Sequence, residues 1–184
     1  MTQVLNFKNL DNETIAFLTE KGKFINVSKN EIFIQPSAKN TDITFVITGL
    51  SRGYFIVKGE EKTIGFRNEG SLIASYKSII LNKPTNIYFQ AIEETMLFTI
   101  SYEHIKKLEI NNILVLQTIN KLLKQQLVST LQRIENHITL SPKEHYLYFI
   151  RENKDFANRV PLKHLASYIG IKPESLSRIR AKIS

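Results

Sequence analysis

The chain contains the stretch Pro161-Leu162-Lys163-His164-Leu165-Ala166-Ser167-Tyr168-Ile169-Gly170-Ile171-Lys172-Pro173-Glu174-Ser175-Leu176-Ser177-Arg178-Ile179-Arg180. This stretch predicts two helices joined by a tight turn. Gly170 stands where the first helix needs a left-handed residue, a conformation that glycine adopts at little cost. Pro173 suits the first turn of the second helix, where its missing N–H loses no hydrogen bond. Small Ala166 permits a close approach of the helices, and the apolar positions that can face one shared core are Leu165, Ile169, Ile171, Leu176 and Ile179. This pattern is typical of a DNA-binding helix-turn-helix.

Polar side chains occupy the outward positions of the second helix. The candidates for contact with DNA are Lys172, Glu174, Ser175, Ser177, Arg178 and Arg180. The alternative is an ordinary helical hairpin packed in a small core, because two helices joined by a short turn are common. We favour DNA binding because the alanine, the glycine and the apolar positions all fall in the same register.

The chain is basic, and its positive charge is concentrated near the C-terminal end. Its formal net charge is +8, and the nine basic and four acidic residues from Ile138 onward leave a net +5 there. An excess of Lys and Arg favours a polyanionic partner, either nucleic acid or an anionic membrane surface. No apolar run approaches the roughly 20 residues that span a bilayer, and the first ten residues do not resemble a signal peptide. We therefore expect nucleic acid and no membrane as the partner.

The sequence contains no cysteine, which excludes disulfides, a thiolate nucleophile and a cysteine-ligated iron–sulfur cluster. This composition fits a cytoplasmic protein. The histidines lack metal-ligand spacing, so we expect surface or helix-face residues and no metal site at His104, His137, His145 and His164. There is also no GxSxG motif, P-loop or pair of carboxylates suited to acid–base chemistry. The sequence thus predicts no catalytic residues and no enzyme, and it identifies no cofactor.

The first hundred residues read as a short helix followed by strands. The helix is expected to follow Asp11 and to end near Gly22. The strands are expected from Phe24 onward, within 31–36, 44–49, 53–59, 62–66, 86–91 and 96–100. Two of them flank Glu60-Glu61, which we interpret as the turn of a hairpin. Short, evenly spaced strands with glycine-marked turns predict a β-barrel or sandwich.

Near Ser101 the hydrophobic period changes from two to about 3.5 residues. The positions that recur at alternating spacings of three and four are Ile113, Leu116, Asn120, Leu123, Leu127, Thr130 and Ile134. Such a seam favours the pairing of two long helices in a homodimer, with Asn120 as a polar residue that fixes the register. The alternative is one amphipathic helix that covers the barrel of its own subunit.

The next helix has a strong start signal in Ser141-Pro142-Lys143-Glu144. Serine at the N-cap, proline at the first helical position and glutamate at the third form a capping box. Its buried face is expected to hold Tyr146, Phe149 and Ile150, and a loop over 153–158 leads to Pro161.

This order of elements resembles the catabolite activator/FNR superfamily of bacterial transcription regulators over essentially the whole chain. Phe45-Val46-Ile47-Thr48-Gly49 is similar to the family's strand-and-glycine motif, and Asn68-Glu69-Gly70-Ser71-Leu72-Ile73 to its turn before the ligand cassette. The segment 161–180 resembles the branch whose members end shortly after this helix. The resemblance implies an α+β fold with a cyclic-nucleotide-binding-like jelly roll, or double-stranded β-helix, over 1–105. It further implies a long dimerisation helix over 106–137 and an all-α helix-turn-helix domain over 138–184.

The resemblance also implies a homodimer that reads a palindromic operator in double-stranded DNA, with RNA polymerase as a further candidate partner. By motif position, Arg178 matches a base-contacting arginine and Glu174 a base-contacting glutamate. The alternative for this pair is a surface salt bridge between residues four apart. Pro173 replaces a third base-reading arginine of the best-known member, so a different DNA sequence is expected. Lys172 stands at the N-cap, where it caps poorly but can meet a phosphate.

Cyclic-nucleotide-binding members of the family hold their ligand with a glutamate and an Arg-Ser pair. Here Ser75 replaces the glutamate, Thr85 the arginine and Asn86 the serine, while Lys83 lies two positions before Thr85. A buried phosphate without its arginine is poorly compensated. We therefore expect a degenerate effector pocket that does not bind cyclic AMP, with any effector unidentified. Two alternatives stay open: a cyclic-nucleotide-responsive regulator with these unconventional pocket residues, and a ligand-binding barrel whose C-terminal helices mediate protein contacts.

Overall fold

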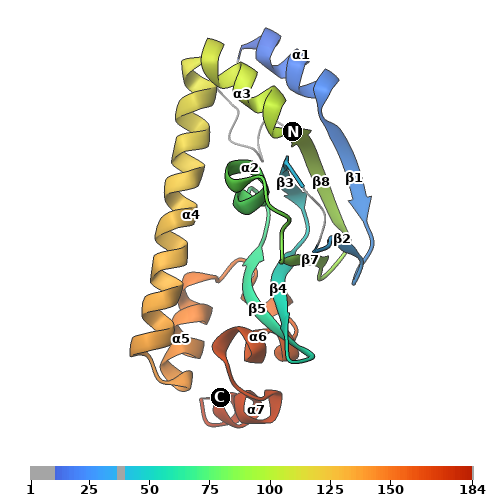
Figure 1. Ribbon diagram of the computed structural model, residues 1–184. Coiled ribbons are helices and arrows are strands. Elements are labelled where there is room, and N and C mark those ends of the chain that lie inside the picture. The colour runs from blue at the N-terminus through green and yellow to red at the C-terminus, as the bar shows by residue number, and fades with distance from the viewer. Residues whose placement is uncertain (1–10, 37–39, 184) are drawn as a thin grey trace.

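The computed structural model describes residues 11–36 and 40–183, and its elements follow the predicted order (Figure 1). The strands are β1 (Lys23–Val27), β2 (Ile32–Ile34), β3 (Asp42–Thr48), β4 (Ser51–Val57), β5 (Glu60–Arg67), β6 (Leu72–Ala74), β7 (Tyr88–Ala91) and β8 (Thr95–Ser101). The helices are α1 (Asn12–Lys21), α2 (Tyr76–Leu81), α3 (Tyr102–Asn111), α4 (Ile113–Thr139), α5 (Pro142–Glu152), α6 (Leu162–Ile169) and α7 (Pro173–Ala181), with a 3-10 turn η1 at Ala157–Arg159.

Two antiparallel sheets face each other and form a jelly roll. Within the described residues, one sheet has the strand order β1-β8-β3-β6 and the other β2-β7-β4-β5. Val46, Ile73 and Leu97 of the first sheet are buried in one cluster with Phe89 of the second. The predicted α+β fold with an N-terminal jelly roll is confirmed.

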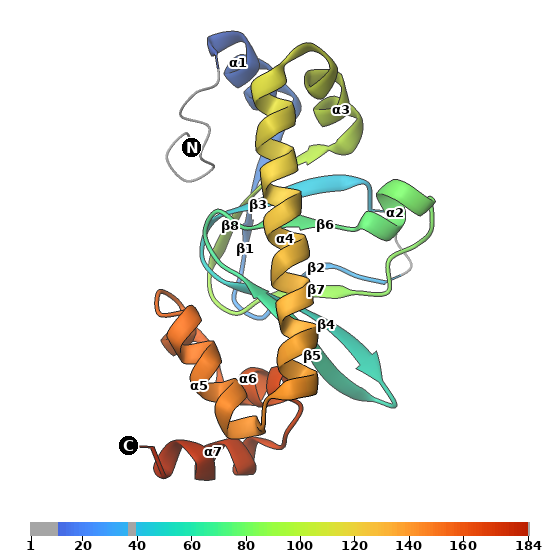
Figure 2. The same cartoon turned by 90° about the vertical axis from the view of Figure 1, so that its left-hand side faces the viewer.

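Helices cover the outer face of the first sheet. Phe45 and Phe98 on that face pack with Ile105 of α3 and with Val115 and Ile119 of α4. Because both faces of β3 are covered, its residues are buried almost without alternation. Helix α4 then continues past the barrel and reaches α5 and α6 (Figure 2).

Helix α4 also carries an apolar face that the barrel does not cover. Its side chains, between 38% and 78% exposed, are Ile113, Leu123, Leu127, Leu131, Ile134 and Ile138. Since an α-helix has 3.6 residues per turn, this exposed apolar face of α4 is rotated about the helix axis by roughly a third of a turn from Val115 and Ile119. The helix therefore covers its own barrel with one side and presents a second hydrophobic stripe to solvent.

Some expectations about the barrel were wrong in detail. The hairpin turn lies at Lys58-Gly59, whereas Glu60 and Glu61 pair with Val57 and Ile56 inside the strands. Lys58 and Gly59 have positive φ angles of 53° and 80°, which a two-residue hairpin turn requires and which glycine supports. Strand β6 and helix α2 were not predicted, because each is too short to show a hydrophobic period.

The segment that leads into β7 also differs from the expectation. Residues 82–87 have no regular structure, so the strand expected from residue 86 begins only at Tyr88. Within the part of the chain that the structure describes, none of the helices combines the length and hydrophobicity needed to cross a membrane.

Candidate nucleic-acid interface

The three C-terminal helices pack around one core. Phe149 of α5, Leu165 and Ala166 of α6 and Leu176 of α7 are all buried there. The predicted capping box at the start of α5 is present, since Ser141 N donates to Glu144 Oε2 at 2.8 Å and Glu144 N to Ser141 Oγ at 3.4 Å. The predicted order of helices in this region is confirmed.

The turn between α6 and α7 has the geometry that its glycine predicts. Gly170 is left-handed with φ +88°, and its N–H donates to the carbonyls of Ala166 and Ser167. The N–H of Ile171 donates back to Ala166 O at 3.0 Å, which completes a Schellman motif. Ala166 is fully buried where the helices meet, so a larger side chain there would force α6 and α7 apart.

The outer surface of α7 is polar and accessible. The exposed candidates are Lys172, Glu174, Ser177, Arg178 and Arg180, while Ser175 is partly exposed. Nη2 of Arg178 donates to Ser175 Oγ at 3.3 Å, and the described residues show no ion pair between Arg178 and Glu174. The salt bridge considered as an alternative is thus not formed, and both charged groups lie open to a ligand.

Two features of α7 refine the sequence interpretation. Lys172 is the N-cap and makes no side-chain capping bond, as expected for lysine. Ile179 was expected in the shared core, but it is partly exposed and lies outside the buried cluster.

The helix-turn-helix is docked directly on the barrel. Leu50, Phe66 and Ile92 of the barrel belong to the same buried cluster as the core of α5–α7. Ser167 of α6 donates its hydroxyl to Glu61 O at 2.8 Å and accepts the N–H of Thr63 at 2.9 Å. Since β5 is an edge strand, α6 covers backbone groups that would otherwise lack a strand partner.

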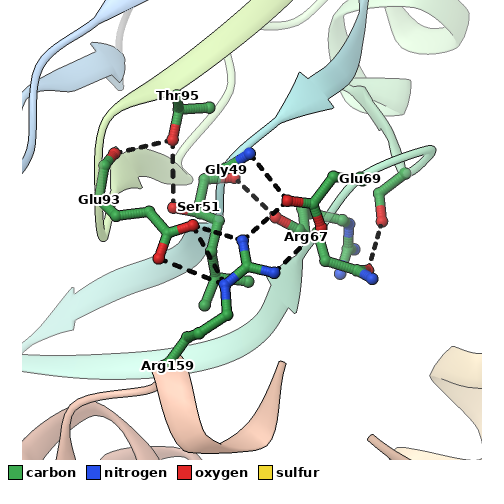
Figure 3. A network of polar contacts seen from close by, with 10 residues as sticks. Gly49, Ser51, Arg67, Glu69, Glu93, Thr95 and Arg159 are labelled. Carbon is green, nitrogen blue, oxygen red and sulfur yellow. Dashed lines mark hydrogen bonds and ion pairs between the residues drawn. The ribbon is translucent and has the colours of Figure 1, made fainter. Parts of the chain in front are cut away.

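Arg159 adds a charged link between the same two parts of the molecule (Figure 3). Its guanidinium lies between Glu69 and Glu93 of the barrel, with Nη2 2.8 Å from Glu69 Oε1 and Nε 3.2 Å from Glu93 Oε1. Glu69 also accepts the N–H of Gly49 at 2.9 Å. Burial opposes ionisation of Glu69, but the bonds from Arg159 and Gly49 outweigh it and lower the pKa of this carboxyl.

We expect Arg159→Gln to lower the free energy of unfolding by about 1 kcal/mol, because the ion pairs are about one third exposed and partly screened by solvent. Two carboxylates would also be left close together. Urea denaturation of the full chain measures this change. Arg151→Gln is the matched control, because Arg151 pairs with Glu152 on the exposed surface of one helix. An equal change in both variants would show that Arg159 contributes no more than an ordinary surface pair.

Two of the histidines that were expected on the surface or on a helix face are buried. His145 of α5 and His164 of α6 are only 2% and 5% exposed. Burial, together with His137 and Arg133, lowers the pKa of His145 to about 4. Burial, with the charges of Arg52 and Lys163, likewise lowers the pKa of His164 to about 4. Both histidines lie on the buried face of a helix, so the helix-face part of the expectation holds and the surface part does not.

Within the described residues, the candidate effector side chains are either engaged in local hydrogen bonds or exposed. Ser75 caps α2 with its Oγ 3.0 Å from Ser78 Oγ, and Thr85 Oγ1 accepts the N–H of Ile87 at 3.2 Å. Lys83 and Asn86 are exposed. A cavity of about 380 Å³ does lie between the barrel and α4, lined by the segment 66–72 and by α4 residues, but none of the four candidates lines it.

The predicted seam residues lie on one side of α4. Ile113, Leu123, Leu127 and Ile134 belong to its exposed apolar face. The remaining members are partly buried Leu116 and exposed Asn120, whose Nδ2 donates to Leu116 O at 3.0 Å, and exposed Thr130. Leu131 and Ile138, which the sequence reading did not select, complete the stripe.

Residues that join the two parts of the molecule were missed altogether. Arg159 lies 90 residues from Glu69 along the chain, and Ser167 lies 106 residues from Glu61. Neither hydrophobic periodicity nor motif spacing reports such distant pairs.

The architecture is similar to that of several solved bacterial regulators. The c-di-GMP-responsive global regulator CLP of Xanthomonas campestris matches with a TM-score of 0.77 at 16% sequence identity, over 94% of this chain and 91% of that one. A CooA mutant from Carboxydothermus hydrogenoformans matches with a TM-score of 0.75 at 16% identity, over 98% and 83%. A protein assigned to the CRP/FNR family of transcriptional regulators from Eubacterium rectale matches with 0.73 at 16% identity, over 96% and 85%.

No family model matches the sequence, and no curated protein matches it either. The structural likenesses extend over nearly the whole chain, and they show that it has the fold of the CRP/FNR transcription regulators. The family resemblance in the sequence is thus confirmed at the level of the fold.

Proposed function

We propose that this chain is a sequence-specific DNA-binding transcription regulator of the CRP/FNR type that acts as a homodimer in the cytoplasm. The observation that carries the proposal is the polar, accessible surface of α7, held outward by a buried core and a left-handed Gly170. A helix presented in this way can enter a major groove. The excess of basic residues after Ile138 supplies attraction for phosphates. The proposal assigns no catalytic activity.

The proposal divides the chain into three functional parts. We assign the sensor barrel to the range 1–105, the dimerisation helix to 106–137 and the DNA-binding domain to 138–184. Within the described residues, the range 106–137 contains the end of α3 and most of α4, which are separate helices. The exposed apolar face of α4 supports the dimer, because such a stripe is stabilised when a second copy covers it. Two α7 helices related by two-fold symmetry would read a palindromic operator. RNA polymerase is a further candidate partner.

We also propose that cyclic AMP is not the effector. The hydroxyls of Ser75 and Thr85 already bond within their own segments, and Lys83 and Asn86 lie exposed. None of these four side chains is an arginine that could neutralise a buried cyclic phosphate.

Selection from a randomised duplex pool tests the proposal. The purified protein is incubated with the pool in the presence and absence of cyclic AMP, and the bound DNA is sequenced. We expect one two-fold symmetric motif in both arms. A motif found only with the nucleotide would refute the proposal about the effector, and no enriched motif in either arm would favour a barrel whose C-terminal helices bind protein.

We expect Arg178→Ala to weaken binding to the selected site by about 1–3 kcal/mol and to relax the preference at one base pair, because arginine reads guanine with two parallel hydrogen bonds. Titration of the selected duplex and of single-base variants measures both effects. Lys77→Ala is the control, since it removes the same charge from exposed α2 on the barrel. If Arg178→Ala lost the same affinity for every DNA sequence, Arg178 would contact a phosphate and not a base.

A further inference from the structure

Two arginines lie close together between the barrel and α4 without a matching carboxylate. Arg67 ends β5, and its Nη1 donates to the carbonyl of Phe66 at 2.8 Å. Its Nε is buried and has no hydrogen-bond partner. The like charge of Arg133 on α4 acts on it, and neither arginine forms an ion pair within the described residues.

A small cavity separates the two side chains. It has a volume of about 80 Å³, and its polar lining consists of Arg67, Ser129, Thr130, Arg133, Asn153 and Tyr168, with no acidic residue. One water molecule needs only about 10–15 Å³ by this measure, so the cavity has room for a polyatomic group. Its lining shares Phe66, Arg67, Ser129, Asn153 and Phe156 with the 380 Å³ cavity between the barrel and α4.

The nearest carboxylates in the adjoining cavities have other partners. Glu69 lines the larger cavity but bonds to Arg159. Glu152 lines a neighbouring groove together with Arg133, but it pairs with Arg151 at 2.7 Å. The positive charge between β5 and α4 is therefore not balanced by the carboxylates around it.

The two like charges are unfavourable for each other in this arrangement. Burial lowers the pKa of the Arg67 guanidinium, and Arg133 adds repulsion. Both side chains are partly exposed, but Nε of Arg67 is buried without a partner. An unpaired buried polar atom on a charged group is costly, and an anion between the two arginines would interact with both. Arginine is suited to such a partner because its planar fork matches the oxygens of phosphate and carboxylate. Two guanidinium groups match the charge of a phosphate dianion better than that of a single carboxylate.

We propose that the cavity between Arg67 and Arg133 binds the phosphate group of a small phosphorylated molecule, whose remainder occupies the adjoining 380 Å³ cavity. Ser129 offers a hydroxyl to a remaining phosphate oxygen, whereas the hydroxyl of Thr130 already donates to Gln126 O at 2.8 Å. The site does not include Ser75 or Thr85, the positions that correspond to the cyclic-nucleotide cassette. Its walls come from β5, from α4 and from the segment after α5, so the ligand would contact the barrel, the long helix and the C-terminal region together.

Binding is tested on the full chain without DNA, so its failure and the failure of the DNA-binding proposal are separate results. The probes are inorganic phosphate and ribose 5-phosphate, with ribose and with sodium chloride of equal ionic strength as references. Isothermal titration calorimetry and ³¹P NMR line broadening measure affinity. We expect saturable binding of both phosphates, with the tighter binding for ribose 5-phosphate, and none for ribose.

Variants locate the bound phosphate. Arg67→Gln and Arg133→Gln should each weaken binding roughly 10- to 100-fold, the range expected when one charge-assisted hydrogen bond is lost. Arg151→Gln, which removes the same charge from the exposed surface of α5, should leave the affinity unchanged. If Arg67→Gln fails to fold, Arg133→Gln still decides the matter, because Arg133 lies on the helix surface lining the cavity. Absence of saturable binding, or equal weakening in all three variants, would overturn the proposal.

Discussion

Replacing Leu123 with aspartate should convert the protein from a dimer to a monomer. Leu123 belongs to the exposed apolar face of α4 and is 38% exposed in the single chain. In the proposed dimer it would be buried against the second copy, where an unpaired carboxylate costs several kcal/mol. The substitution acts in both subunits, so we expect dimer affinity to fall at least 100-fold. Light scattering combined with size-exclusion chromatography measures the mass directly.

The same variant should lose affinity for a palindromic operator, because a monomer contacts only one half-site. The folded barrel should persist, since Val115 and Ile119 hold α4 on it with other side chains. Leu127→Asp, at a 59% exposed position on the same face, is a second test of the same seam. Lys121→Asp is the control, as it places a carboxylate on an exposed position of α4 outside that face. If both leucine variants stay dimeric, the seam is wrongly assigned.

Mild acid should destabilise the C-terminal core through His145 and His164. The pKa of each is lowered to about 4 in the folded chain, mainly by burial, against about 6.5 when unfolded. The unfolded state therefore binds more protons between these values. The stabilisation is fully present above pH 6.5 and is lost as the pH falls toward 4. The expected loss is about 2 kcal/mol per histidine by pH 5.

Urea denaturation at pH 7.5 and at pH 5 measures this dependence. His145→Phe should reduce it, because phenylalanine keeps an aromatic ring beside Tyr168 and removes the buried Nε2 that has no hydrogen-bond partner. His137 and Arg133 face His145, and their positive charges add to the cost of protonation. His104→Gln is the control, since His104 is partly exposed on α3. An unchanged pH slope in His145→Phe would show that this histidine is protonated without penalty in the folded protein.

Much of the fold could be predicted from the sequence where a local signal is strong. The capping box at Ser141, the left-handed Gly170 and the period of α4 each reflect interactions within a few residues. Strand β6 and helix α2 are shorter than any hydrophobic period and were missed. The hairpin turn was placed at Glu60-Glu61 because two adjacent charged residues are typical of a turn. The structure instead places it at Lys58-Gly59, where both residues have positive φ angles.

The candidate DNA-contacting residues could be chosen from the sequence because they are defined by their positions on one helix. Their accessibility was not determined in this way. It depends on the core in which Leu176 is buried against α5 and α6, so that the opposite side of α7 lies outward. The effector residues, chosen by position in a family motif, were instead found in separate local hydrogen bonds or exposed to solvent.

The sequence by itself determined the order of the longer elements, the helix boundaries at Ser141 and Gly170, and the apolar stripe on α4, because capping and periodicity act between near neighbours. Only the tertiary structure decided that α6 covers the edge of β5, that Arg159 bonds to Glu69 and Glu93, and that Arg67 and Arg133 line one cavity. These contacts join residues many tens of positions apart. They depend on how the barrel and the helices pack, which no local pattern in the chain records.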